Sequence, residues 1–388
     1  MVNVSSLFSQ LLKEFPRKEF AIIVQHYGAE KYSKGFESWT QLVSMVFCHL
    51  AKAESLREIC NGLSCCLGKL THLGINKSPN KSILSYANEH RNSDVYKDLF
   101  FEMLRKFRGS GQLGFGKKPK FTFQNKLLSL DSTVITLCLK LFPWAKYRTA
   151  KGGVKVHVLL DHDDYMPEFI HITTGKKADV KIAKALELNP GSIIAMDKAY
   201  TDYKMFSDWT ENGIFFVTRL KEKTPYEVIK TETATRYENI LSDEIIKLTC
   251  TGKKKCNHHL RKVVVEDKEN NRTIVLLANN LELDAMTISN IYRDRWEIEL
   301  FFKLIKQNLK IKTFVGTTEN ALKTQIWTAM ISLLLIKWLH FLSKAKWSMS
   351  NLFSMLRLSL FIYRPLMEWI NNPFGLESPI IEVQMSLL

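Results

Sequence analysis

The sequence contains the stretch Tyr292-Arg-Asp-Arg-Trp-Glu-Ile-Glu-Leu-Phe-Phe-Lys-Leu-Ile-Lys306. Its apolar residues recur at helical spacing. In a helix, one stripe about 60° wide and roughly 21 Å long would hold Tyr292, Arg295, Glu299 and Lys306. The apolar side next to this stripe must pack on another element, so Glu299 borders a buried face. A carboxylate placed in this way can reach from a packed helix to the edge of a sheet.

Two aspartates interrupt or end strands that are otherwise apolar. Asp131 follows Leu127–Leu130, and Asp197 follows Ile193–Met196 at a strand end, where open sheets commonly bind ligands. A charge in such a place is costly unless it is paired or binds a cation. Either aspartate alone is more typical of a turn or a cap, but their similarity favours a shared cation.

Phosphoryl transfer on nucleic acid requires these residue types together. Two divalent ions about 3.5–4 Å apart can activate an oxygen nucleophile and stabilise the leaving oxygen of a phosphodiester. Hard ions of this kind prefer oxygen ligands, so three carboxylates suffice for magnesium, with manganese as the alternative. The guanidinium of Arg295 and the ammonium of Lys306 are suited to hold neighbouring phosphates.

The residues also resemble a known family. The spacing Tyr-x2-Arg-x3-Glu-x6-Lys at 292–306 is similar to the signature of the insertion-sequence family of bacterial DDE transposases whose β-rich domain interrupts the catalytic fold. Leu130-Asp-Ser-Thr133 resembles the family's first aspartate motif, and Asp197-Lys-Ala-Tyr200 resembles its second. The similarity covers nearly the whole chain, including Ser6-Leu-Phe-Ser-Gln-Leu-Leu12 and Asn308-Leu-Lys-Ile-Lys-Thr-Phe314.

The resemblance implies metal-dependent cleavage at the ends of a mobile element, followed by joining of the freed 3′-hydroxyl to target DNA. It assigns the catalytic, metal-binding triad to Asp131, Asp197 and Glu299. It assigns DNA contacts near the scissile phosphate to Tyr292, Arg295 and Lys306. The implied substrate is double-stranded DNA, namely terminal inverted repeats and target, bound by a homodimer in a synaptic complex. Members with this signature are also associated with a hairpin intermediate, and a bacterial cytoplasm near the nucleoid is the implied location.

The second motif departs from the family pattern, which usually reads Asp-Arg-Gly followed by Tyr or Phe. Lys198 keeps the charge for a DNA contact but lacks the planar fork of arginine, and Ala199 would be strained if its backbone needed positive φ. Two other functions therefore stay open. One is a metal-dependent DNA nuclease without strand transfer, and the other is a catalytically inactive DNA-binding protein derived from a transposase.

The order of apolar patterns predicts an α/β fold: a ribonuclease H-like mixed sheet with helices, interrupted by a β-rich insertion and preceded by an N-terminal helical domain. Core strands are expected at Leu127–Leu139, Val154–Leu160, Glu168–Thr173, Ser192–Met196 and Ile214–Arg219. Insertion strands are expected at Tyr226–Ile229, Glu244–Cys250, Lys262–Glu266 and Thr273–Ala278. Helices are expected at Ala178–Leu188, Tyr203–Glu211, Asp284–Lys312 and Thr317–Lys344.

These patterns divide the chain into six parts. They are a helical DNA-binding region at 1–108, a glycine-rich basic linker at 109–120, the first part of the catalytic core at 121–221, the β-rich insertion at 222–283, the last part of the core at 284–316, and a helical C-terminal region at 317–388.

In the N-terminal region, Ser55-Leu-Arg-Glu58 is typical of a capping box, and Ser78 with Pro79 predicts the start of another helix. Together they indicate a helix-turn-helix, with an ordinary helical pair as the alternative. The second helix would present polar side chains to DNA: Asn80, Lys81, Ser85, Asn88 and Arg91. Of these, Lys81 and Arg91 are the predicted phosphate contacts.

A basic cluster surrounds the first expected hairpin: Lys146, Arg148, Lys151 and Lys155. It is either a solvated turn or a groove that follows DNA phosphates, and we assign Arg148 and Lys151 to DNA contact. His157, which alternates with apolar neighbours, is expected to be structural. The aspartates at 161, 163 and 164, beside His162, are expected to form an ordinary loop.

Composition supports a nucleic-acid partner. The 388 residues carry 55 Lys and Arg against 39 Asp and Glu, a net charge of +16 that suits a polyanion. Seven scattered cysteines favour a reducing compartment over a disulfide framework. The apolar stretch Ile326–Leu342 contains Lys337 and His340, so we expect a buried helix and no membrane partner.

Overall fold

The protein is described by a computed structural model for residues 5–31, 33, 35–66, 70–111, 113, 120–148, 151–174, 179–232, 237–250, 256–308 and 314–375. The chain divides into two units. The first comprises Met1–Leu113, Asn308–Lys310 and Thr324–Leu388, and the second comprises Gly114–Gln307 and Ile311–Lys323. The boundary at 113/114 falls inside the expected linker, 109–120. The N-terminal and C-terminal helical parts fall into one unit.

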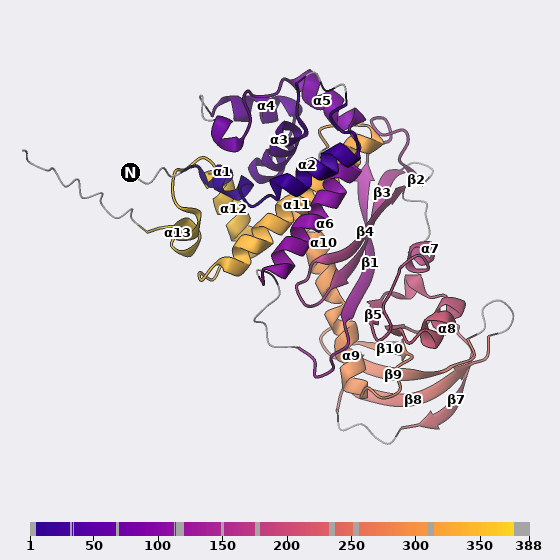
Figure 1. Ribbon diagram of the computed structural model, residues 1–388. Coiled ribbons are helices and arrows are strands. Elements are labelled where there is room, and N and C mark those ends of the chain that lie inside the picture. Colours follow the sequence, from indigo (N-terminus) through magenta and orange to yellow (C-terminus); the bar gives the residue numbers. More distant parts are fainter. Residues whose placement is uncertain are drawn as a thin grey trace, which may run out of the picture. The chain divides into compact units, whose positions relative to one another are not determined.

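The second unit contains the strands β1 Leu127–Leu137, β2 Lys146–Arg148, β3 Lys151–Asp161, β4 Pro167–Thr174, β5 Ile193–Met196, β6 Phe215–Arg219, β7 Tyr226–Thr231, β8 Ile240–Leu248, β9 His259–Asp267 and β10 Arg272–Ala278. Among the described residues they form one ten-stranded sheet with the order β2-β3-β1-β5-β6-β10-β9-β8-β7, and β4 pairs with β3 (Figure 1). The pairs β1–β5 and β5–β6 are parallel and the others are antiparallel. This mixed sheet is the expected ribonuclease H-like architecture.

The strands of the insertion extend the core sheet directly. β10 pairs antiparallel with β6, with Ala278 opposite Val217, so β7 to β10 continue the same ladder. The predicted strands are confirmed, and their ends differ by a few residues. β8 begins at Ile240 and β9 at His259, because polar residues can belong to a strand when long-range pairing holds them.

Both faces of the central strands are buried, since successive side chains of a strand point to opposite faces. One face packs against α8 Tyr203–Glu211 through a cluster that includes Leu130, Met196, Phe206 and Phe216. The other face packs against α9 Ala285–Asp294 through Ala195, Val217, Ile288 and Ile291. Asp131 is an even number of residues from Leu127, so its side chain points to this second face.

Two predicted helices are shorter than expected. The helix expected at Asp284–Lys312 is interrupted at Arg295, where α9 ends and α10 Trp296–Asn308 begins, and residues 309–312 lie outside the described part. The helix expected at Ala178–Leu188 is the single turn α7 Asp179–Ala183. Leu186 and Leu188 pack on the core from an irregular segment, so their apolar spacing reflects tertiary packing.

The first unit contains α1 Leu7–Leu12, α2 Arg17–His26, α3 Ser38–Ala51, α4 Leu56–Ser64, α5 Lys81–His90, α6 Asp94–Gly109, most of α11 Glu319–Leu342, α12 Met349–Ser359, α13 Leu366–Asn371 and the 3-10 turn η1 Leu70–Leu73. In this unit the N-terminal helix α1 lies beside the segment that follows α12, because the Leu7 amide donates to the Ile362 carbonyl at 3.0 Å. α11 is long and apolar enough to cross a membrane by length and composition, but 78% of its most apolar window is buried, as expected for a core helix.

The expected helix start at Ser78 is wrong by two residues. Asn80 caps α5 by accepting a hydrogen bond from the Ile83 amide at 2.9 Å, whereas the Ser78 hydroxyl donates to the Cys60 carbonyl. Ser55 does cap α4 as predicted. The segment between α4 and α5 is longer than the roughly three to four residues of a helix-turn-helix turn, so these helices form an ordinary pair.

The first unit contains a histidine that should make folding sensitive to acid. His49 on α3 is fully buried, and burial lowers its pKa to about 3 although the Gln325 backbone opposes this effect. Below the ordinary pKa of about 6.5, the unfolded chain gains a proton that the folded protein does not, so stability falls as the pH falls. At pH 5 this loss is about 2 kcal/mol. The free energy of unfolding in urea should fall by about 2 kcal/mol less between pH 7 and pH 5 in His49→Gln than in the wild type. An equal fall in both proteins would contradict this prediction.

Candidate active site

The parallel pairing of β1 with β5 sets two carboxylates side by side. The last paired residues are Leu130 and Met196, and each is followed directly by an aspartate. Neighbouring strands lie about 4.8 Å apart, so the backbones of Asp131 and Asp197 are adjacent at the point where the β1–β5 pairing ends. The same register that buries apolar neighbours therefore forces two negative charges together.

Asp131 lies in a poorly solvated place. Its side chain is 21% exposed and accepts a hydrogen bond from the Ser132 amide at 2.7 Å. Burial raises the pKa of Asp131 to about 6. The Ser132 amide and Arg295 oppose this rise, while Glu299 and Asp197 add to it. The carboxyl is thus ionised at neutral pH against an electrostatic cost.

Asp197 is held by two donors. Its Oδ2 lies 2.5 Å from Nη2 of Arg219, the last residue of β6, and its Oδ1 accepts from the Ala199 amide at 3.0 Å. Burial acts to raise the pKa of Asp197, but Arg219 and the Ala199 amide outweigh it and the net shift is downward. Asp197 thereby caps the 3-10 turn η2 Lys198–Tyr200.

Arg295 connects the third carboxylate to the first. It stands between α9 and α10, where its Nη2 lies 2.7 Å from Glu299 Oε1 and its Nη1 lies 3.5 Å from Asp131 Oδ2. Its guanidinium carbon is 5.4 Å from the ring centre of Tyr292. Burial acts to lower the pKa of Arg295, but Tyr292 and the two carboxylates raise it overall. A buried cation thus partly neutralises Asp131 and Glu299.

These groups line one cleft of about 980 Å³ in the second unit. Its wall includes the three carboxylates together with Arg219, Tyr292, Arg295 and Trp296, and residues 265–270 of the β9–β10 hairpin. Among the described residues, no three acidic, histidine or cysteine side chains gather closely enough to hold a metal ion. In this arrangement the arginines stand beside the carboxylates.

Comparison with known proteins identifies the chain. Residues 122–335 match the family described as "Transposase DDE domain", which includes Asp131, Asp197 and Glu299 and more than half of the sequence. The chain belongs to this family. It is therefore an insertion-sequence transposase, an enzyme with a DDE domain, and domains of this family use divalent metal ions. Residues 3–76 match a second family, described only as a domain of unknown function.

Three relatives carry corresponding names. The "Putative transposase y4zB" of Sinorhizobium fredii is 31% identical over 264 residues, 67% of this chain and 71% of that protein. The "Probable transposase for insertion sequence element IS5377" of Geobacillus stearothermophilus is 31% identical over 230 residues, 59% of this chain and 60% of that protein. The "Putative transposase for insertion sequence element IS4SA" of Synechocystis sp. is 25% identical over 262 residues, 66% of this chain and 70% of that protein.

The cleft brings together five of the residues that the sequence proposed for this transposase, namely Asp131, Asp197, Glu299, Tyr292 and Arg295. Lys306 lies further along α10, is half-buried and does not line the cleft. Lys198 is in the turn after Asp197, with its side chain 45% exposed and 4.0 Å from Glu222. The backbones of Arg148 and Lys151 belong to β2 and β3, but their side chains lie outside the described part.

Two expectations about individual residues need correction. Arg91 is 8% exposed and donates to Gln41 and to the Phe36 carbonyl, so it is committed to the interior of the first unit, whereas Lys81 is exposed at the start of α5. Ala199 is not among the described non-glycine residues with positive φ. It lies in a 3-10 turn, so the alanine is unstrained there.

Sequence reasoning missed several residues of the site. Arg219 pairs with Asp197, and its one signal was a charge at the end of an apolar strand. Asp179 accepts from the Ser132 hydroxyl at 2.9 Å and pairs with Lys155 at 3.0 Å, behind the first aspartate. Such partners come from distant segments, so local spacing cannot reveal them.

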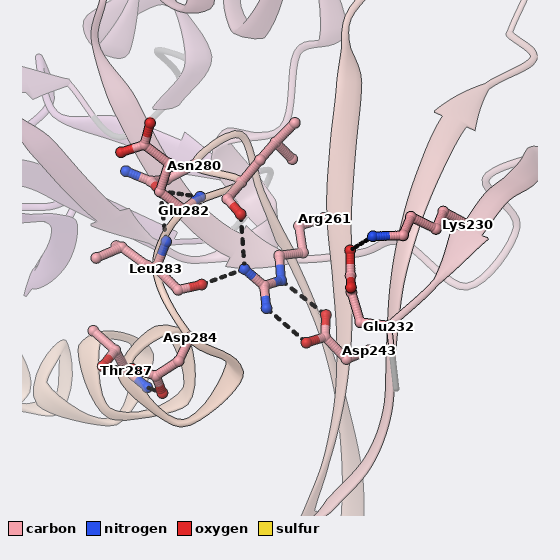
Figure 2. A network of polar contacts seen from close by, with 10 residues as sticks. Lys230, Glu232, Asp243, Arg261, Asn280, Glu282, Leu283, Asp284 and Thr287 are labelled. Carbon is pink, nitrogen blue, oxygen red and sulfur yellow. Dashed lines mark hydrogen bonds and ion pairs between the residues drawn. The ribbon is translucent and has the colours of Figure 1, made fainter. Parts of the chain in front are cut away.

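The insertion braces the start of α9. Arg261 on β9 forms a two-bonded ion pair with Asp243 on β8, at 2.8 and 2.6 Å, and its Nη1 also donates to the carbonyls of Leu281 and Leu283 (Figure 2). Asp284 follows at once and caps α9 by accepting from the Thr287 amide. The helix that leads to Tyr292 is thus anchored to the insertion strands.

The electrostatic cost at Asp131 can be measured without DNA. Its folded-state pKa of about 6 lies above the ordinary value, so ionisation at neutral pH opposes folding, and this cost disappears as the pH falls through 6 towards 4. Asp131→Asn should therefore raise the free energy of unfolding by about 1–3 kcal/mol at pH 7.5 without divalent metal, and by less at pH 5.

Urea unfolding at both pH values checks this result. The matched control is Asp163→Asn, on an exposed turn, which should change stability by no more than about 0.5 kcal/mol. An Asp131→Asn protein less stable than the wild type at pH 7.5 would show that the carboxylate makes favourable contacts that exceed the cost of its burial.

Proposed function

We propose that this transposase cleaves double-stranded DNA at the terminal inverted repeats of an insertion sequence and joins the freed 3′-hydroxyl ends to target DNA. Asp131, Asp197 and Glu299 are the catalytic carboxylates and the metal ligands. One observation carries the proposal: two adjacent parallel strands and helix α10, which directly follows α9, contribute three carboxylates to one cleft. The names of the relatives support DNA as the substrate.

The donor set fits divalent magnesium, or manganese, because all three side chains offer carboxylate oxygens. The raised pKa of Asp131 fits as well, since burial makes ionisation of this carboxyl costly and a bound cation would offset that cost. When bound, the cations activate the attacking oxygen and stabilise the leaving oxygen. Arg295, which now bridges Asp131 and Glu299, has to release one carboxylate before they can act as ligands together.

Released from this bridge, Arg295 can bind a phosphate next to the scissile bond through its planar fork. Tyr292, stacked beside it, keeps the guanidinium oriented. Lys306, Lys198, Arg148, Lys151 and Lys81 are proposed to hold the DNA backbone further away, in keeping with the net charge of +16. We assign residues 1–108 to DNA binding and expect a homodimer in which two element ends are paired, in a bacterial cytoplasm close to the nucleoid.

Two other functions are distinguishable by their products. A nuclease would use the same carboxylates and release cut ends without joining them. An inactive DNA-binding descendant would bind the ends without cutting. The three carboxylates in one cleft favour an active enzyme over the second alternative.

The purified chain should nick a labelled duplex that carries the element end, in the presence of magnesium, and should then produce molecules in which the end is joined to a target plasmid. The reason is that the nicked 3′-hydroxyl is the nucleophile of the second step at the same cations. Denaturing gels with end-labelled DNA report both products. Cut ends without joined molecules would identify the nuclease, and binding without nicking would identify the inactive protein.

Asp131→Asn, Asp197→Asn and Glu299→Gln should each abolish nicking while DNA affinity changes little, because each removes a charged metal ligand. Glu297→Gln is the matched control: it lies two residues from Glu299 on α10 and also lines the cleft, but it has no assigned role as a ligand. Its nicking rate should stay within about threefold of wild type. Normal nicking by any of the first three variants would remove that residue from the triad.

A further inference from the structure

A buried chain of hydrogen bonds links elements of the second unit on the Asp131 face of the sheet. Ser129 Oγ lies 2.7 Å from His162 Nε2, and His162 Nδ1 lies 2.7 Å from Asp294 Oδ2. The side chains of His162 and Asp294 are 5% and 4% exposed, and Ser129 is fully buried. These three residues belong to β1, to the turn between β3 and β4, and to the last position of α9.

The imidazole in this chain is neutral. Burial, with the nearby ammonium of Lys120, lowers the pKa of His162 to about 4. A neutral imidazole has one N–H and one acceptor nitrogen. Donation from Nδ1 to Asp294 and acceptance at Nε2 from the Ser129 hydroxyl use both. Lys120 pairs with the other oxygen of Asp294, so the buried carboxylate is also compensated.

The order Ser–His–Asp is that of hydrolase triads, but this chain cannot act in that way. A nucleophilic serine must reach a substrate, whereas Ser129 is 0% exposed and does not line the cleft. A buried polar chain with every member bonded instead fixes geometry, because a shift of any member would leave a buried polar group unsatisfied.

The two ends of this chain are next to the catalytic groups. Ser129 precedes Asp131 by two residues on β1, so both side chains have the same parity on the strand. Asp294 directly precedes Arg295, at the interruption between α9 and α10. The Ile298 amide donates to the Arg295 carbonyl at 3.1 Å, which begins the turn that carries Glu299.

We propose that Ser129, His162 and Asp294 form a positioning relay that fixes the distance between Asp131 on the sheet and the Arg295–Glu299 segment of the helix. The relay rests on the proposed function, since the geometry that it holds is that of the catalytic carboxylates. His162 and Asp294 are assigned as positioning residues: Asp294 lines the cleft, but its two carboxylate oxygens are bonded to His162 and Lys120, and both residues act through the backbone of Arg295 and through β1.

The test compares His162→Ala, Asp294→Ala and Asp294→Asn with the wild type in the full-length protein. Loss of the relay should lower the single-turnover nicking rate of saturated DNA by about tenfold to hundredfold, since small misplacements are costly in catalysis. DNA affinity should change by less than about twofold, because Ser129 and His162 do not line the cleft and both oxygens of Asp294 are bonded within the protein. Asp294→Asn should retain most of the rate, because its amide oxygen still accepts from His162 Nδ1.

A second measurement does not depend on activity. Mn²⁺ titrated onto the DNA-free protein and followed by electron paramagnetic resonance reports the carboxylate geometry directly. Affinity for Mn²⁺ should weaken about tenfold in His162→Ala and Asp294→Ala, and should be near wild type in Asp294→Asn. The matched control is His49→Ala in the first unit, which removes an equally buried histidine whose Nε2 lies 3.1 Å from Thr328 Oγ1. It should lower the melting temperature and leave nicking rate and Mn²⁺ affinity unchanged.

The outcomes separate the two proposals. If the wild type nicks DNA and binds Mn²⁺, but His162→Ala and Asp294→Ala match it in both, the relay is overturned and the proposed function stands. If the wild type neither nicks nor binds Mn²⁺, the proposed function fails and the relay with it. Should His162→Ala not fold, the pair at 294 decides: equal rates for the alanine and asparagine variants overturn the relay, and rescue by asparagine supports it.

Discussion

The parallel pairing of β1 with β5 places two carboxylates side by side, and the surrounding residues compensate for their repulsion. Leu130 and Met196 are the last paired residues, so Asp131 and Asp197 lie next to each other where this pairing ends. Arg219 neutralises the second aspartate directly, whereas the first is left with a raised pKa and only a long contact to Arg295. The transposase fold thus holds two carboxylates close together in a poorly solvated cleft, where the ionisation of Asp131 lowers stability.

Such a cleft needs rigid support, and buried polar contacts provide it at both ends of α9. Arg261 and Asp243 hold the segment before the helix, and His162 holds Asp294 at its end. Buried ion pairs of this kind contribute little net stability because desolvation offsets their attraction. Their directional hydrogen bonds do define one arrangement of the helix over the sheet. The insertion strands, which continue the core sheet, are therefore linked through Arg261 to the segment that begins α9.

The sequence alone predicted the features that depend on local pattern. Alternating apolar residues located the strands, and strand-end aspartates with the helical spacing of Tyr292 and Glu299 located the cleft. Features that depend on distant partners were not predictable. The interruption at Arg295 lies inside a continuous apolar repeat. Arg91 is a basic residue of the kind that contacts DNA, but its side chain is buried and bonded to Gln41. Asp163 and Asp164 form a turn as expected, whereas Asp161 is the buried last residue of β3 and His162 bonds to Asp294 at the end of α9.

The departure at Lys198-Ala199 can be judged in the same physical terms. A glycine would be needed at 199 only for positive φ, and the backbone there is a 3-10 turn capped by Asp197. An arginine at 198 would offer a planar fork, but Asp197 already has a guanidinium partner in Arg219, from the adjacent strand β6. The second aspartate is held by Arg219 and by the backbone amide of Ala199, so its geometry does not depend on either substituted side chain. Because the two substitutions leave the backbone unstrained and the carboxylate fully paired, they give no structural reason to expect an inactive site.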